Sequence, residues 1–102
     1  MIGVDLGGTN IRAGKIVHEK IIHLTKLPTP ARGSVEEVLD QIYAVIDGCF
    51  DAGTITIGVG VPSVVDVENG IVYDVTNIPS WKVVPLKELL EARYKIPVYV
   101  NN

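Results

Sequence analysis

Val4-Asp5-Leu6-Gly7-Gly8-Thr9-Asn10-Ile11-Arg12 is the stretch of the sequence from which the fold is read most directly. Its two adjacent glycines separate two apolar runs, Ile2 to Leu6 and Ile11 to Val17, as expected of two strands joined by a tight turn. A third apolar run, Lys20 to Leu27, follows the short break at His18-Glu19. Because short breaks favour antiparallel neighbours, the chain is predicted to begin with a three-stranded meander.

The next segment carries the signals of an amphipathic helix. Pro28, Pro30 and Gly33 end the strand pattern, and Ser34 with Glu37 forms the sequence of a capping box. Apolar residues then recur at helical spacing and predict one buried face: Val35, Val38, Leu39, Ile42, Val45, Ile46 and Cys49.

The second half of the chain predicts shorter elements. Alternation from Ile55 to Val61 indicates a strand, which Pro62 ends. An irregular excursion follows, in which a turn at Glu68-Asn69-Gly70 precedes a short strand, Ile71 to Tyr73. Pro85 suits the first position of a helix whose apolar stripe is Leu86, Leu89 and Leu90, and Pro97 opens a last strand, Val98 to Val100.

The order of these elements defines the fold class. Three antiparallel strands followed by strands that alternate with helices indicate an α/β sheet with parallel additions and crossover helices. The last predicted strand is followed only by Asn101-Asn102, where further structure is expected. Residues 1–102 are therefore expected to be an incomplete N-terminal fragment of a larger protein.

Composition excludes several classes of protein. Of 102 residues, 47% are apolar and 21% are charged, which is typical of a globular chain and not of a disordered one. A net charge of -3 leaves no basic footprint for nucleic acid, and no apolar run is long enough to span a membrane. No basic leader is visible, and Cys49 is alone, so a reducing cytoplasm is expected.

The glycine turn has the chemistry of an anion site. Adjacent glycines can adopt positive φ and turn backbone amides toward one point, where a phosphate can approach closely. Asp5 is a candidate magnesium ligand, because Mg²⁺ prefers oxygen. The candidate phosphate-binding residues are Gly7, Gly8, Thr9, Asn10 and Arg12. A plain hairpin explains the same residues, and the motif alone does not decide between the two.

Four motifs together resemble the ROK family of sugar kinases and sugar-responsive repressors, over essentially the whole chain. The first is Ile2 to Asn10, similar to the phosphate motif of that family. Gly58 to Pro62 with Asp66 and Gly70, then Asn77 to Trp81, resemble two later motifs, and Val98 to Asn102 resembles the strand that leads into an Asn-Asp pair.

The resemblance implies the actin-like ATPase fold, which is ribonuclease-H-like, and a two-domain parent that binds ATP, Mg²⁺ and a sugar. It implies that Pro62, Ser63, Asn77 and Asn102 contact the sugar, although Ser63 stands where the family usually has glycine. The family's general base is the aspartate that follows the position of Asn102, so no catalytic residue is expected within this chain. The parent is expected to be a homo-oligomer, without membrane or nucleic-acid contacts through this segment.

The leading interpretation is the N-terminal part of an ATP-dependent hexose kinase that is inactive by itself. The alternatives are the sugar-sensing domain of a ROK-type repressor and another actin-like ATPase. Among the remaining residues, Trp81 and Cys49 are expected in the core, Asp66 is expected to hold its loop, and His18 and His23 are expected at the surface.

Overall fold

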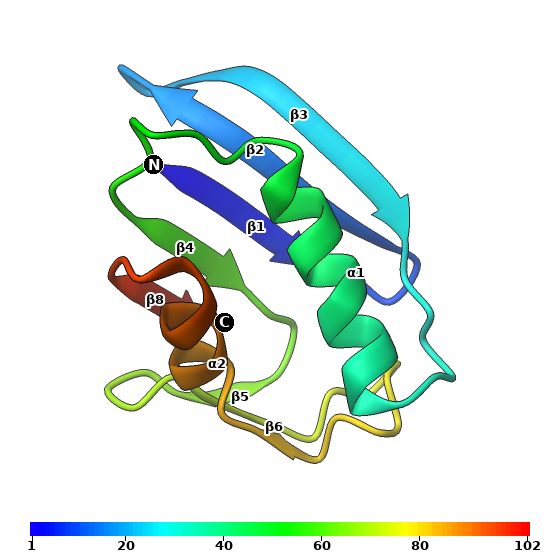
Figure 1. Cartoon of the computed structure of the whole chain (residues 1–102). Coiled ribbons are helices and arrows are strands. Elements are labelled where there is room, and N and C mark those ends of the chain that lie inside the picture. The colour runs from blue at the N-terminus through cyan, green and yellow to red at the C-terminus, as the bar shows by residue number, and fades with distance from the viewer.

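A five-stranded sheet is the centre of the fold in the computed structural model, which describes residues 1–102 (Figure 1). The strands are β1 (Ile2–Leu6), β2 (Asn10–Val17), β3 (Lys20–Pro28), β4 (Ile57–Gly60) and β8 (Val98–Asn101). Their order across the sheet is β3-β2-β1-β4-β8. The β1–β2 and β2–β3 pairs are antiparallel, whereas β4 pairs in parallel with β1 and β8 with β4. The predicted meander and its parallel additions are confirmed.

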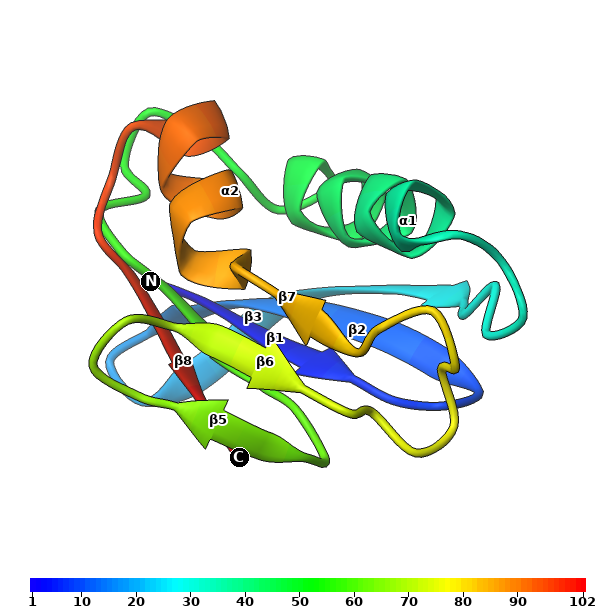
Figure 2. The same ribbon diagram turned by 90° about the horizontal axis from the view of Figure 1, so that it is seen from below.

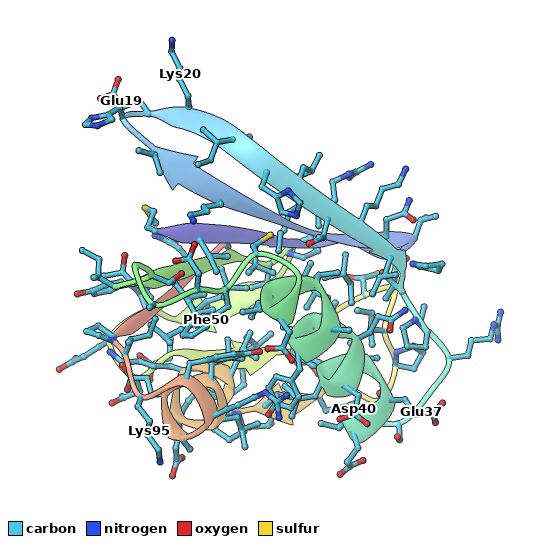
Figure 3. The ribbon with its side chains drawn as sticks, turned by 45° about the horizontal axis from the view of Figure 1, so that its top comes forward. Glu19, Lys20, Glu37, Asp40, Phe50 and Lys95 are labelled. Carbon is cyan, nitrogen blue, oxygen red and sulfur yellow. The ribbon has the colours of Figure 1, made fainter.

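The β2–β3 hairpin turns on two residues that both have positive φ, 50° at His18 and 65° at Glu19. Positive φ at both central residues is the geometry of a type I′ turn, whose twist matches that of the flanking strands. Figure 3 labels Glu19 and Lys20 at the tip of this hairpin, which extends beyond the rest of the sheet. His18 and His23 are exposed, as expected.

Helix α1 (Val35–Asp47) begins with the predicted capping box. The Glu37 amide donates to Ser34 Oγ at 3.1 Å, and the Ser34 amide donates to Glu37 Oε1 at 3.1 Å. Its apolar face packs on β1, β2 and β3 through Val38, Leu39, Ile42, Val45 and Ile46. Burial of each such side chain contributes about 1.5–3 kcal/mol.

Helix α2 (Leu86–Tyr94) lies on the same face of the sheet as α1, as Figure 2 shows. Pro85 is its N-cap residue and not its first helical residue, so the predicted start differs by one position. Side chains join the two helices, because Tyr94 donates its hydroxyl to Asp47 Oδ1 at 2.8 Å and Arg93 Nη2 donates to Asp47 Oδ2 at 3.1 Å. Burial and the bond to Asp47 raise the pKa of Tyr94. Neither helix has the length and hydropathy that a membrane-spanning helix requires.

A second, three-stranded sheet replaces much of the predicted irregular excursion. Its strands are β5 (Val64–Asp66), β6 (Ile71–Tyr73) and β7 (Val83–Val84), in the order β5-β6-β7. Only β6 was predicted. The strand predicted from Ile55 to Val61 is shorter at both ends, since β4 spans Ile57–Gly60 and Ile55 is 70% exposed.

The opposite face of the large sheet carries no helix (Figure 2). Three glycines, Gly14, Gly3 and Gly58, pair in register across β2, β1 and β4. Leu24 of β3 and Tyr99 of β8 continue this row at its two ends, and both are more than half exposed. Directly opposed residues share one face of a sheet, so these five residues form one row with glycine at its three central positions. We call it the glycine row.

Candidate phosphate and sugar site

The turn between β1 and β2 is closed by one backbone hydrogen bond, from the Gly7 amide to the Asn10 carbonyl at 3.0 Å. Neither Gly7 nor Gly8 has positive φ; among the glycines of this chain, Gly70 alone has it. The expectation of positive φ in this turn was therefore wrong. The turn closes through ordinary backbone angles, and its glycines are required for a different reason.

That reason is close contact. A Cβ added to Gly7 would stand 2.7 Å from the Asn10 carbonyl oxygen, and one added to Gly8 would stand 2.8 Å from Asn77 Cβ and 3.2 Å from Asn77 Nδ2. Real Cβ atoms essentially never lie within 3.0 Å of another heavy atom, so a Cβ at either position would force a shift. The two glycines therefore let the turn close on itself and let Asn77 pack directly against it.

Most backbone carbonyls of this turn accept hydrogen bonds, whereas two of its backbone amides have no acceptor in the protein. The Thr29 hydroxyl donates to the Gly7 carbonyl at 2.7 Å, and the Thr29 amide donates to the Thr9 carbonyl at 2.9 Å. With the Asn10 carbonyl engaged by Gly7, three carbonyls of the turn accept bonds from the protein. The amides of Gly8 and Thr9 donate to no protein acceptor. Free amides in a tight turn are the donors that an anion site uses.

Asp5 and Arg12 lie opposite each other on β1 and β2, directly beside the turn. Arg12 Nη1 is 3.9 Å from Asp5 Oδ2, and the two side chains are 47% and 67% exposed. A single exposed carboxylate is a suitable protein ligand for Mg²⁺, which keeps several waters and takes further oxygens from phosphate. No group of three or more His, Cys, Asp or Glu side chains is placed to hold a metal by itself.

Asn77 lies on a loop with a buried base. Val75, Ile78 and Trp81 are each at most 3% exposed, and three backbone bonds join them to one another. Asn77 is exposed between these anchors and faces Gly8. Trp81 therefore anchors the loop from the core, as expected.

Pro62, Ser63 and Asn102 lie beyond the carboxyl ends of neighbouring parallel strands. Asp5 of β1 pairs with Gly60 of β4, which in turn pairs with Asn101 of β8. The residues that follow these strands thus share one edge of the sheet with the glycine turn, the edge where open α/β sheets place ligands. No hydrogen bond connects the three residues to the turn, and Ser63 Oγ is buried without a partner.

Asp66 and Cys49 lie where the sequence predicts them. Asp66 accepts from the Asn69 side chain at 2.9 Å and from its amide at 3.2 Å, which lowers the pKa of Asp66 and fixes the loop as expected. Cys49 is 5% exposed and packs in the core. A surface hollow of about 410 Å³ is lined by polar residues between the β5–β6 turn and α2, and it contains no predicted site residue.

Thr29 belongs to this site, although none of the sequence motifs includes it. Its threonine-proline surroundings resemble an ordinary loop, and no periodicity marks it. The observed register of the meander explains its position, because Asn10 opposes Pro28 and the residue after β3 then faces Thr9. A bulge between Lys15 and Ile16 shifts this register by one residue, so the tight turn at His18-Glu19 alone would have placed Pro28 opposite Thr9.

The family model described as the ROK family matches residues 1–102. The chain belongs to the ROK family. Within it, the chain is 38% identical over 103 residues to a glucokinase of Streptomyces coelicolor, covering 99% of this chain and 32% of that protein. It is 29% identical over 114 residues to a putative xylose repressor of Caldicellulosiruptor, covering all of this chain and 27% of that protein.

Among solved structures, the ROK family glucokinase of Streptomyces griseus in complex with glucose and AMPPNP matches with a TM-score of 0.88. The identity is 36%, and the match covers 99% of this chain and 32% of that one. This match confirms the α/β, actin-like ATPase fold. The chain spans about a third of the length of these ROK relatives.

Proposed function

We propose that this ROK chain is the N-terminal, phosphate-binding part of an ATP-dependent hexose kinase, which transfers the γ-phosphoryl group of ATP to a sugar hydroxyl. The observation that carries the proposal is the contact between Gly8 of the glycine turn and Asn77. Phosphoryl transfer depends mainly on positioning and charge stabilisation, so the phosphate and sugar residues must be neighbours. The glucokinase relatives agree with this assignment.

Each residue of the site has a role in this proposal. The free amides of Gly8 and Thr9, with Asn10 and Arg12, bind the phosphates. Asp5 holds the metal, and Mg²⁺ neutralises charge on the β- and γ-phosphates when it is bound. The proposed sugar contacts are Asn77, Asn102 and the Pro62-Ser63 loop.

The rest of the parent completes the site in this proposal. A general base accepts the proton of the attacking hydroxyl, and a second domain closes on the sugar and excludes water. The candidate residues lie on an open edge of the sheet and not in a cavity, which suits a site that another domain covers. A homo-oligomeric parent in the cytoplasm belongs to the same proposal.

The isolated chain should not phosphorylate sugars, because it supplies neither the base nor the second wall of the cleft. The check is a coupled ATP assay with the purified 102-residue chain and each candidate sugar, beside the parent protein at equal concentration. Sugar-dependent turnover by the chain alone would overturn this expectation.

The second candidate is the sugar-sensing domain of a ROK repressor, and the match to the putative xylose repressor over the whole chain is consistent with it. The same sugar contacts would then serve recognition without phosphoryl transfer. Membership of the ROK family removes the third interpretation, an actin-like ATPase of another family.

Calorimetric titration of the parent protein with glucose, N-acetylglucosamine, N-acetylmannosamine and fructose separates the two candidates. A coupled ATP assay then follows on each sugar that binds. Binding with turnover supports the kinase and names its substrate. Binding without turnover favours the repressor, and no binding of any of the four sugars contradicts a kinase for these substrates.

A further inference from the structure

Thr29 holds the glycine turn through two hydrogen bonds to backbone carbonyls. The proposed function gives Thr29 no role of its own. Its hydroxyl donates to the Gly7 carbonyl at 2.7 Å, and its amide donates to the Thr9 carbonyl at 2.9 Å. Both bonds run from the residue after β3 across to the turn between β1 and β2. One residue therefore fixes the first and the third residue of the turn.

The consequence is electrostatic. A carbonyl oxygen directed at a phosphate repels it, whereas an amide hydrogen attracts it. Thr29 binds the Gly7 and Thr9 carbonyls, and the amides of Gly8 and Thr9 are left free to donate. Without the Thr29 hydroxyl, the Gly7 peptide loses the bond that directs its carbonyl away from the amide side of the turn.

We infer that Thr29 is a positioning residue for nucleotide binding, which keeps the carbonyl of Gly7 turned away from the phosphate and the amides of the turn presented to it. This inference rests on the proposed ATP-binding role of the turn. Thr29 itself contacts neither phosphate nor sugar in this account, and it acts through the peptide of Gly7.

Two substitutions separate the hydroxyl from the rest of the side chain. In Thr29→Val the shape and the backbone amide stay, and only the hydroxyl bond to Gly7 is lost. Thr29→Ser keeps the hydroxyl. Thr25→Val is the matched control, because Thr25 lies in β3 and its hydroxyl also donates to a backbone carbonyl, that of Val45 in α1 at 2.6 Å.

The experiment measures AMPPNP affinity by calorimetry and the sugar KM by a coupled assay, for the parent protein and the three variants. Thr29→Val should weaken AMPPNP binding about tenfold and leave the sugar KM unchanged, which corresponds to one lost hydrogen bond. Thr29→Ser should bind within about twofold of the wild type. Thr25→Val should lower the Tm without changing AMPPNP affinity.

The outcomes distinguish this inference from the proposed function. If the wild type turns over ATP and Thr29→Val binds AMPPNP as the wild type does, the inference is wrong and the kinase assignment stands. If the wild type shows no turnover but binds AMPPNP, the kinase assignment fails and the affinity of Thr29→Val still decides the role of Thr29. If the wild type does not bind AMPPNP, both fail.

Discussion

Gly8 lies against the side chain of Asn77, so close that a Cβ on Gly8 would stand 2.8 Å from Asn77 Cβ. The two residues come from the first hairpin and from the loop before β7. Their contact joins the turn with free amides to an exposed side-chain amide. In the proposed kinase it sets the distance between the phosphates and the sugar.

Gly8→Ala should therefore separate the turn from the Asn77 loop. Insertion of a methyl group into a packed contact costs about 1–3 kcal/mol, so the free energy of unfolding should fall by that amount. The double variant Gly8→Ala/Asn77→Gly should recover part of the loss, because it removes the opposing Cβ. Chemical denaturation of the chain measures both changes.

Gly60→Ala is the control for this prediction. A Cβ at Gly60 would meet nothing nearer than the Val4 carbonyl oxygen at 3.8 Å, an ordinary contact. If Gly8→Ala and Gly60→Ala cost the same, the Gly8–Asn77 contact does not constrain the fold.

Gly70→Ala should be among the most destabilising glycine substitutions in the chain. Gly70 has φ of 66°, and an added Cβ would overlap the Cβ of Lys87 in the first turn of α2. The left-handed conformation costs about 1–2 kcal/mol for a residue with a Cβ, and the overlap adds to this. We expect a loss of more than about 2 kcal/mol in the free energy of unfolding, measured by urea denaturation.

Gly58→Ala provides the comparison for Gly70→Ala, since its Cβ would meet only the flexible end of Met1 at 3.3 Å. Equal losses at the two positions would show that neither the φ angle nor the packing against Lys87 matters.

Asp51→Asn should make the chain less sensitive to acid. Lys15 donates to the Asp51 side chain and lowers the pKa of this carboxyl, with a further contribution from the Gly53 amide. A lowered pKa in the folded state stabilises the fold above the unfolded pKa, and this contribution is lost as the pH falls through the folded pKa, below about pH 4. The variant should therefore lose less stability between pH 7 and pH 3 than the wild type.

Urea denaturation at the two pH values measures this difference, and Glu19→Gln is the control because Glu19 forms no ion pair. An unchanged pH dependence in Asp51→Asn would mean that the Lys15–Asp51 pair is not formed in solution.

The isolated chain should associate with itself through the glycine row. The face carries exposed Leu24 and Tyr99, and apolar surface of this kind favours association. Sedimentation velocity should show a mass that rises with concentration. The double variant Leu24→Lys/Tyr99→Lys should abolish the rise, whereas Ile55→Lys, at an exposed position on the loop before β4, should not. A monomer at all concentrations would contradict this prediction.

Local signals explain which parts of the fold were predictable. The meander and α1 follow from runs and caps that act over a few residues, as the Ser34–Glu37 capping box shows. The small sheet was missed because β5 and β7 have three and two residues, too few to show a period. The pairing that builds it, Val72 with Val84, joins residues that no local pattern connects.

The candidate site was predictable as a set of residues and not as an arrangement. The Gly-Gly sequence marked the turn, but the expected positive φ was wrong, because the glycines serve close contacts with Asn10 and Asn77. Those contacts depend on tertiary packing. Thr29 was missed for the same reason, since its role follows from the β2–β3 register.

The most direct test of the central claim is ³¹P NMR of the parent protein with ATP, Mg²⁺ and the sugar that binds most tightly. The account predicts that ADP and a sugar phosphate appear in equal amounts, and that little inorganic phosphate forms. ATP that remains intact beside the bound sugar, or that yields inorganic phosphate without sugar phosphate, would contradict it.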